Sequence, residues 1–429
     1  MNKILKNILI STLVAVITAG VFFLGFFTRE WTYSDTQRAV INLLDKYEKY
    51  YFYKDEDVLS LIENAILDDY STYYTKSEFG DVENSAKGEN YGVGLTFQHG
   101  SLKIVEVIMN SPCFNQGIIA GGTLVAVSCN GITASGDYDS VLEVITNASS
   151  GDSIDLQIDY GGTIKNYSVT KQKYNKSFVV YRNSQGSYAF SSINGELGLN
   201  LFSDEKITAN GVGYVKYTAF SGKENNVYGS YVQLKNALDK FKADGNKKLI
   251  LDLRGNGGGY LEILSKVSGL LVEERSGKQV LATVKDRDGN KREYLVNNKL
   301  SSNYNFEKII VLADVNTASA SEVLIGALID YDSQNKVSIV IEGHKNGEQI
   351  EYRTYGKGIM QTTYPLGGFG GDAVKLTTAR ICWPKELYCI HGRGILPQDG
   401  TLTVSKGGLG DEELKSAIEK LFTADSERD

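Results

Sequence analysis

The sequence predicts an α/β core that follows a small β-rich module. In the core, the apolar runs 249–253 and 309–312 each precede a turn of small residues and a stretch with helical spacing (261–271 and 321–329), and 337–341 is a third apolar strand. Buried strands that alternate with helices are typical of an α/β fold. In the module, short alternating runs are separated by glycine-rich turns, which favours β structure.

Length, composition and charge indicate the number of domains and argue against nucleic-acid binding and zinc sites. The chain has 429 residues, which favours two or three domains. Its 45 Lys and Arg and 52 Asp and Glu give a net charge of −7, so no basic footprint for nucleic acid is present. Three His and four Cys occur without a CxxC pair or an HExxH sequence, which disfavours a zinc site. We expect neither metal nor cofactor.

An apolar segment near the N-terminus predicts a membrane anchor. Residues 8–27 carry no charge and are long enough to cross a bilayer of about 30 Å. The run is longer than the apolar part of a cleavable signal, so we expect an uncleaved single-pass helix, with cleavage as the alternative. Lys3 and Lys6 place the N-terminus in the cytoplasm, and the rest of the chain outside it, at the cell membrane.

We therefore predict four regions: a membrane anchor (1–30), an N-terminal helical region (31–88), the β-rich module (89–173) and the core (174–429). Within the second region, helical spacing over residues 34–70 indicates a helical pair that packs on the main body.

An extracytoplasmic compartment permits disulfides. Cys382 and Cys389 flank a possible hairpin loop, and Cys113 and Cys129 share another segment. Free buried thiols are an equal alternative, so the pairing is left open.

Two turns between a strand and a helix point to chemistry. Residues 254–259 (RGNGGG) leave backbone N–H groups unobstructed near a helix N-terminus, which suits an oxyanion, although a tight turn that needs positive φ would look the same. Residues 316–322 (NTASASE) could expose a serine hydroxyl, although Ser319 or Ser321 could equally be a helix N-cap.

A serine nucleophile needs a base. His344 and His391 have no triad context, whereas Lys357 lies between Gly356 and Gly358 and has Gln361 four residues on. Alternatively, Lys357 is an ordinary charged residue of a surface loop.

Four motifs in order, LDLRGNGGG, TASASE, YGKG with its following Gln, and IHGRGI, resemble the C-terminal processing peptidase (tail-specific protease) family. The resemblance covers about residue 35 to the C-terminus. It implies a core of the crotonase/ClpP-like type with ββα units, and an inserted PDZ domain at residues 89–173.

By this resemblance, Ser319 is the nucleophile and Lys357 the general base, with Gln361 holding the lysine amine. The backbone N–H groups of Gly259 and Ala320 form the oxyanion hole. The amine must be neutral to act, so we expect Lys357 to be buried with Nζ near Ser319 Oγ.

The resemblance also assigns a PDZ loop that takes the C-terminal carboxylate of a substrate, formed by Tyr91, Gly92, Val93, Gly94 and Leu95. The partners implied are protein or peptide substrates with free C-termini and the membrane, and homo-oligomerisation stays open. The spacing between Ser319 and Lys357 is longer here than in the family pattern. The extra residues lie within 344–354, which we expect to form a surface hairpin or loop.

The resulting hypothesis is a membrane-anchored, extracytoplasmic serine endopeptidase of the C-terminal processing type. A catalytically inactive PDZ scaffold is the first alternative. An acyl-handling enzyme of crotonase-like architecture is the second, and it lacks a recognisable signature for coenzyme A.

Overall fold

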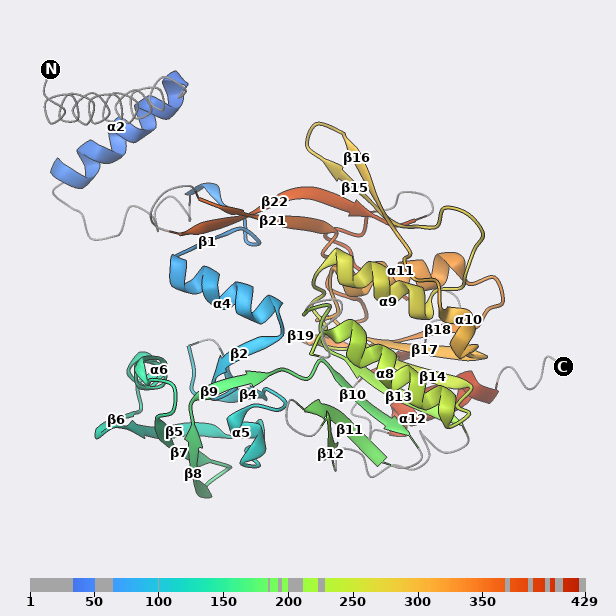
Figure 1. Ribbon diagram of the computed structural model, residues 1–429, viewed down its shortest axis with the longest axis horizontal. Coiled ribbons are helices and arrows are strands. Elements are labelled where there is room, and N and C mark those ends of the chain that lie inside the picture. The colour runs from blue at the N-terminus through green and yellow to red at the C-terminus, as the bar shows by residue number, and fades with distance from the viewer. Residues whose placement is uncertain are drawn as a thin grey trace, which may run out of the picture. The chain divides into compact units, whose positions relative to one another are not determined.

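The structure of the protein is a computed structural model. It describes residues 34–50, 65–98, 100–183, 186–191, 195–199, 211–222, 228–366, 371–384, 389–397, 402–405 and 412–423. The chain divides into two units, residues 1–72 and 73–429. Figure 1 shows the helices and strands of the described residues.

The first unit contains helix α2 (Asp35–Tyr50), which matches the first predicted helix. This helix exposes the apolar side chains of Val40, Ile41 and Leu43. The predicted anchor, 8–27, and residues 51–64 lie outside the described residues. No helix within the described residues is long and apolar enough to cross a membrane.

The core of the second unit is built on an eight-stranded sheet with the order β12-β11-β10-β13-β14-β17-β18-β23 in the described part of the chain. The strands from β13 to β23 run parallel, and β10, β11 and β12 extend the sheet with antiparallel pairs. Their bounds are β10 (Val179–Asn183), β11 (Gly186–Ser191), β12 (Gly195–Leu199), β13 (Val212–Tyr217), β14 (Lys248–Asp252), β17 (Lys308–Ala313), β18 (Val337–Glu342) and β23 (Leu402–Val404).

Both faces of this sheet are buried, which explains the continuous apolar runs in the sequence. Leu249 and Leu251 of β14 pack into the cluster that holds α8 (Ser230–Ala243), α9 (Leu261–Leu271) and α11 (Ala320–Tyr331). Ile250 points to the opposite face, where it joins residues of α12 (Glu412–Thr423). The predicted strands and helices of this core are confirmed to within one or two residues.

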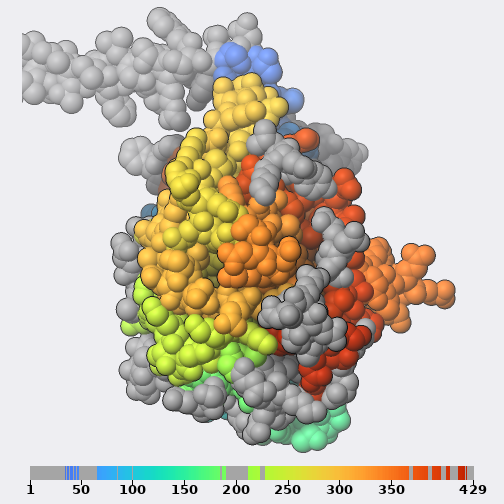
Figure 2. All heavy atoms as spheres, turned by 90° about the vertical axis from the view of Figure 1, so that its right-hand side faces the viewer, coloured from blue at the N-terminus to red at the C-terminus, as the bar shows by residue number. Residues whose placement is uncertain are grey.

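A second sheet places β22 (Ala373–Cys382) between β21 (Ile359–Pro365) and β15 (Val280–Asp286), with β16 (Lys291–Leu295) beyond β15. The hairpin β15–β16 stands out from the core in gold, and the hairpin of β19 (His344–Asn346) and β20 (Gln349–Glu351) stands out in orange (Figure 2). The latter confirms the surface hairpin predicted for residues 344–354.

The module at 89–173 has its own apolar core, which includes Ile104, Leu124 and Leu156. Its elements are β2 (Glu89–Gly92), β3 (Leu95–Phe97), β4 (Ile104–Val107), α5 (Pro112–Asn115), β5 (Thr123–Cys129), β6 (Ile132–Ser135), α6 (Tyr138–Asn147), β7 (Ser153–Asp159), β8 (Ile164–Thr170) and, just beyond, β9 (Gln172–Asn175). Residues 89–97 form two strands rather than one, because Gly92 (φ 145°) and Gly94 (φ 87°) break the extended backbone.

Three short elements complete the described chain: β1 (Thr72–Tyr74), α4 (Lys76–Ala86) and α10 (Ser301–Tyr304). Within the predicted helical region, α4 begins after β1 and leads directly into β2 of the module.

Candidate active site

The two strand-to-helix turns predicted from sequence lie against each other. Gly258, in the turn after β14, has φ 101°. A Cβ atom at this position would lie 2.8 Å from the Cβ of Ser319 and 2.8 Å from the main-chain nitrogen of Ala320. Only glycine allows this approach, so the glycine run positions one turn directly beside the serine of the other.

Asn256, fully buried, holds the two turns together. Its side-chain nitrogen donates to Tyr217 O at 2.8 Å, and its side-chain oxygen accepts the Gly258 amide at 2.9 Å. Its main-chain oxygen accepts the Ala318 amide and the Ser321 hydroxyl, each at 3.0 Å. The buried Ser321 hydroxyl is therefore occupied by a hydrogen bond within the turn. Ser319 remains as the candidate nucleophile.

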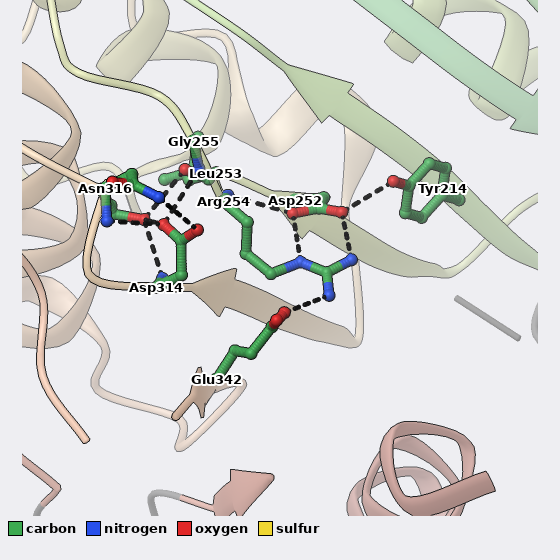
Figure 3. A network of polar contacts seen from close by, with 9 residues as sticks. Tyr214, Asp252, Leu253, Arg254, Gly255, Asp314, Asn316 and Glu342 are labelled. Carbon is green, nitrogen blue, oxygen red and sulfur yellow. Dashed lines mark hydrogen bonds and ion pairs between the residues drawn. The ribbon is translucent and has the colours of Figure 1, made fainter. Parts of the chain in front are cut away.

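A buried ionic network anchors the first turn at the end of β14 (Figure 3). Arg254 contacts both carboxylate oxygens of Asp252, at 2.9 and 2.7 Å, and donates to Glu342 at 2.8 Å. The Tyr214 hydroxyl donates to Asp252 at 2.8 Å. Burial alone would raise the pKa of Asp252, but the hydrogen bonds and charge of Arg254 outweigh it and hold that pKa below its ordinary value.

Asp314 links the two turns from the other side (Figure 3). Its Oδ1 accepts the Gly255 amide, the Asn316 amide and the Thr317 hydroxyl, each at 3.0 Å. The start of the serine turn is thereby fixed to the start of the glycine turn.

Ser319 immediately precedes helix α11 and has a strained backbone, with φ 55° and ψ −117°. Positive φ is uncommon for a residue with a side chain, and such strain persists only where the surroundings impose it. Its amide donates to Glu322 Oε2 at 2.9 Å. Ser319 lines a groove that Gly259 and Lys357 also line, whereas Ala320, the first residue of α11, is buried.

Glu322 lies in the first turn of α11, where it is fully buried. Besides the Ser319 amide, its carboxylate accepts the amides of Gly356 (2.8 Å) and Lys357 (2.9 Å) and the hydroxyl of Thr354. Burial raises the pKa of Glu322, and these four hydrogen bonds oppose that rise. The carboxylate joins the serine turn to the segment that carries Lys357.

The glycines on either side of Lys357 are required by close packing. A Cβ at Gly356 (φ 90°) would lie 2.6 Å from the amide nitrogen of Gly394, and one at Gly358 would lie 2.7 Å from that of His391. The IHGRGI motif thus lies along the YGKG motif, and the Gly392 amide donates to Gly356 O at 2.8 Å.

A groove with a volume of about 1720 Å³ contains most of the predicted catalytic residues. Gly259, Ser319, Lys357 and Gln361 line it, and His344 and His391 do not. Lys357 is half-buried rather than fully buried. The Gln361 amide nitrogen donates to Thr377 Oγ1 at 3.3 Å, so its recorded partner belongs to β22 rather than to Lys357.

The predicted carboxylate loop, 91–95, connects β2 and β3 in the module. The main-chain oxygen of Val93 accepts the Cys113 amide at 3.0 Å. Gly94 lies so close to Ser111 that a Cβ would be 2.0 Å from the Ser111 Cβ. Close packing on α5 therefore sets the shape of this loop.

All four cysteines are free thiols. Burial raises the pKa of the Cys113 thiol to about 12, as suits an inert core residue. The Cys389 thiol donates to Gly358 O at 3.4 Å, next to Lys357.

Sequence reasoning missed two parts of the site. Glu322 stands three residues after Ser319, the spacing of a capping box, which could have signalled its contact with the Ser319 amide. The groove wall formed by α4, with Phe79, Val82 and Glu83, carries no comparable signal.

In sequence, this chain is similar to known peptidases. The family model described as "Peptidase family S41" matches residues 211–399. A probable CtpA-like serine protease of Staphylococcus saprophyticus is 28% identical over 355 residues, 81% of this chain and 62% of that protein. Its counterpart in Staphylococcus aureus is 27% identical over 383 residues, 86% of this chain and 66% of that protein. The alignments thus span somewhat less than two thirds of these relatives.

Among solved structures, the photosystem II D1 C-terminal processing protease is similar with a TM-score of 0.47 and 21% identity, over 85% of this chain and 83% of that one. Mature CPAF in complex with lactacystin is similar with a TM-score of 0.37 and 13% identity, over 83% of this chain and 84% of that one.

Proposed function

Because residues 211–399 carry a peptidase family S41 domain, we propose that this protein is a serine endopeptidase with a Ser319–Lys357 dyad. The observation that carries the proposal is that both residues line one groove, while a single buried carboxylate, that of Glu322, holds the backbone of each.

The chemistry follows from these positions. Ser319 Oγ attacks the carbonyl carbon of the substrate, and Lys357 Nζ takes its proton. Lys357 then gives the proton to the leaving amine, which departs with the C-terminal part of the substrate. A water molecule hydrolyses the resulting ester on Ser319 by the same proton relay and frees the N-terminal part.

The backbone N–H groups of Gly259 and Ala320 are suited to hold the developing oxyanion. Within the described residues, recorded hydrogen bonds of the glycine turn use the amides of Arg254, Gly255, Asn256, Gly258 and Tyr260, and none uses that of Gly259. Ala320 is the first residue of α11, and first-turn amides have no acceptor within their own helix. The positive end of the helix dipole adds to the stabilisation of an anion there.

A lysine amine works as a base only when it is neutral, and burial favours the neutral form. Lys357, which lines the groove, is half-buried. An extended substrate that fills the groove would remove more water from it, so we propose that substrate binding itself completes the activation of the dyad. Gln361, at the same wall, would then turn from Thr377 to hold the amine.

We further propose that the module at 89–173 is a PDZ domain whose loop 91–95 binds the free C-terminus of protein substrates. The apolar residues 8–27 would anchor the chain in the cell membrane, with the catalytic region outside the cytoplasm. Recognition of the free C-terminus is tested by cleavage of two peptides that differ only in a free or an amidated C-terminus. Equal kcat/KM for both would contradict carboxylate recognition.

The dyad is tested by cleavage of an unfolded protein substrate. Ser319→Ala and Lys357→Met should each lose cleavage to background, while Lys345→Met, on the exposed hairpin, should match the unaltered protein. Cleavage retained by Ser319→Ala would exclude this nucleophile. An unaltered protein that binds C-terminal peptides but cleaves nothing would instead support the inactive scaffold.

A further inference from the structure

Two cysteines flank a short segment close to Lys357. Cys382 is the last residue of β22, and Cys389 directly precedes the IHGRGI motif, with six residues between the two cysteines. Both side chains are half-buried, whereas Cys113 and Cys129 are buried in the core of the β-rich module. Cys382 and Cys389 are thus the thiols that a small molecule in solvent can reach.

The main chain of Gly358 brings these two cysteines together. Its oxygen accepts the Ile381 amide at 2.9 Å and the Cys389 thiol at 3.4 Å. Because Ile381 immediately precedes Cys382, the Cys389 sulfur lies beside the end of β22. The two thiols are themselves hydrogen-bonded. A small shift of the sulfur atoms therefore brings them to the length of a disulfide bond, about 2 Å.

The surroundings of Cys382 favour reaction of its thiol. Burial and then the neighbouring Cys389 raise the pKa of this thiol, but the positive charges of Lys285 and Arg380 oppose the rise. Cations near a thiol favour the thiolate, which is the form that attacks a disulfide. Cys113 differs, because burial raises the pKa of its thiol to about 12.

We propose that Cys382 and Cys389 are a redox-active pair, which a low-molecular-weight disulfide converts into an intramolecular disulfide. One cysteine thiolate attacks the small disulfide, forms a mixed disulfide and releases one small thiol. The second cysteine attacks the protein sulfur of that mixed disulfide, forms the bond between Cys382 and Cys389 and releases the second small thiol. The pair loses two electrons and two protons, and the two small thiols carry them away.

The bond would fasten the segment that supports Lys357. Residues 389–394 pack on the lysine turn, where the Gly392 amide donates to Gly356 O at 2.8 Å. Cys389 is the first residue of this segment, so a bond to Cys382 ties the segment to β22. The effect on catalysis rests on the proposed peptidase function, whereas formation of the disulfide does not.

Two opposing effects determine the direction of the change in stability. Oxidation removes the S–H donor from Gly358 O, but a thiol is a weak donor, and the Ile381 amide remains as a partner. Closure of a loop by a disulfide restricts the unfolded chain, and even a short loop gains more from closure than one weak hydrogen bond contributes. The oxidised protein is therefore the more stable form.

The first test is chemical and needs no substrate. The full-length protein is treated with oxidised glutathione at neutral pH, digested without reduction and analysed by mass spectrometry. We expect Cys382 and Cys389 to be joined to each other, with the loss of two hydrogen atoms, while Cys113 and Cys129 remain thiols. Thiols that stay free at 382 and 389, or that end as separate mixed disulfides with glutathione, would overturn the proposal.

Thermal unfolding measures the stabilisation. The oxidised protein should melt about 5 °C above the reduced protein. Cys382→Ser keeps the contact of the Cys389 thiol with Gly358 O but cannot form the bond, so it should melt at one temperature under both conditions. Cys389→Ser, which retains a hydroxyl donor, should behave in the same way. Equal midpoints for the oxidised and reduced forms of the unaltered protein would refute the stabilising role.

Peptide cleavage tests the link to the lysine turn. Just below the melting temperature of the reduced protein, the oxidised protein should keep its activity roughly 10-fold longer. Equal rates of inactivation for the two forms would show that the bond does not support Lys357. If Ser319→Ala cleaves normally, the proposed dyad fails, and the digest and the melting temperatures still decide whether Cys382 and Cys389 are a redox pair.

Discussion

The backbone amide of Lys357 donates a 2.9 Å hydrogen bond to Oε2 of Glu322. The same oxygen accepts the amide of Ser319, also at 2.9 Å. One buried atom therefore fixes the backbone of both proposed dyad residues, which come from segments 38 positions apart in the sequence. Such a shared acceptor couples the positions of the two residues to one side chain.

We expect Glu322→Gln to lower kcat at least 10-fold with little change in KM. A carboxamide offers one acceptor oxygen, so part of the set formed by the Ser319, Gly356 and Lys357 amides and the Thr354 hydroxyl would lose its partner. Each buried donor left without an acceptor costs about 1–3 kcal/mol. Steady-state kinetics with a peptide substrate measures the change. The control is Glu348→Gln on the exposed hairpin, and equal kcat for both variants would contradict this role.

The buried pair of Asp252 and Arg254 predicts a loss of stability that depends on pH. Asp252→Asn leaves the largely buried guanidinium of Arg254 with only part of its partners, at an expected cost of about 3–5 kcal/mol. Urea unfolding at neutral pH measures this cost. A midpoint that does not move would show that the network in Figure 3 contributes nothing to the core.

The pKa of Asp252 is lower in the folded protein than its ordinary value of 3.8. Its contribution to stability is therefore complete above about that pH and is lost as pH falls through the folded value. The stability difference between the unaltered protein and Asp252→Asn should shrink as pH falls below about 4. A difference that stays constant down to the acid transition would assign the effect to packing instead.

Much of the core could be predicted from sequence because its signal is local. Strands such as 249–253 are apolar on both faces, and helices such as 261–271 follow at once. Each strand–turn–helix unit can therefore be recognised from one short stretch of sequence. The glycines of RGNGGG and YGKG were also informative, since the structure requires their lack of a side chain at Gly258, Gly356 and Gly358.

The remainder of the site depends on contacts that no local pattern encodes. Glu322 bonds to residues 354–357 across more than thirty positions, and the Cys389 thiol bonds to Gly358 across 31. The partner of Gln361 could not be predicted either, because Thr377 is placed opposite it by the strand register.

Two neighbouring glycines allow a sharp test of the contact between the turns. Gly258→Ala would place a methyl group 2.8 Å from the Cβ of Ser319, whereas a methyl group at Gly257 meets no atom within 4 Å. We expect Gly258→Ala to lower kcat by about 100-fold or more, since displacement of a nucleophile by about 1 Å has effects of that size. Gly257→Ala is the matched control and should keep most activity. Similar kcat for the two variants would mean that the turn adapts without disturbing Ser319.

Lys171 predicts a stability effect confined to the β-rich module. This buried lysine donates from Nζ to the main-chain oxygens of Ile145 (3.0 Å) and Thr146 (2.7 Å), at the C-terminal end of α6. Lys171→Met removes both hydrogen bonds and a cation at the negative end of the helix, so the module should lose about 1–3 kcal/mol. Hydrogen exchange of α6 amides should accelerate, with exchange in β14 and β17 of the core unchanged. The control is Lys165→Met, at an exposed lysine of the same module, which should leave hydrogen exchange of α6 unchanged. If Lys171→Met also accelerates exchange in β14 and β17, the module and the core unfold as one unit.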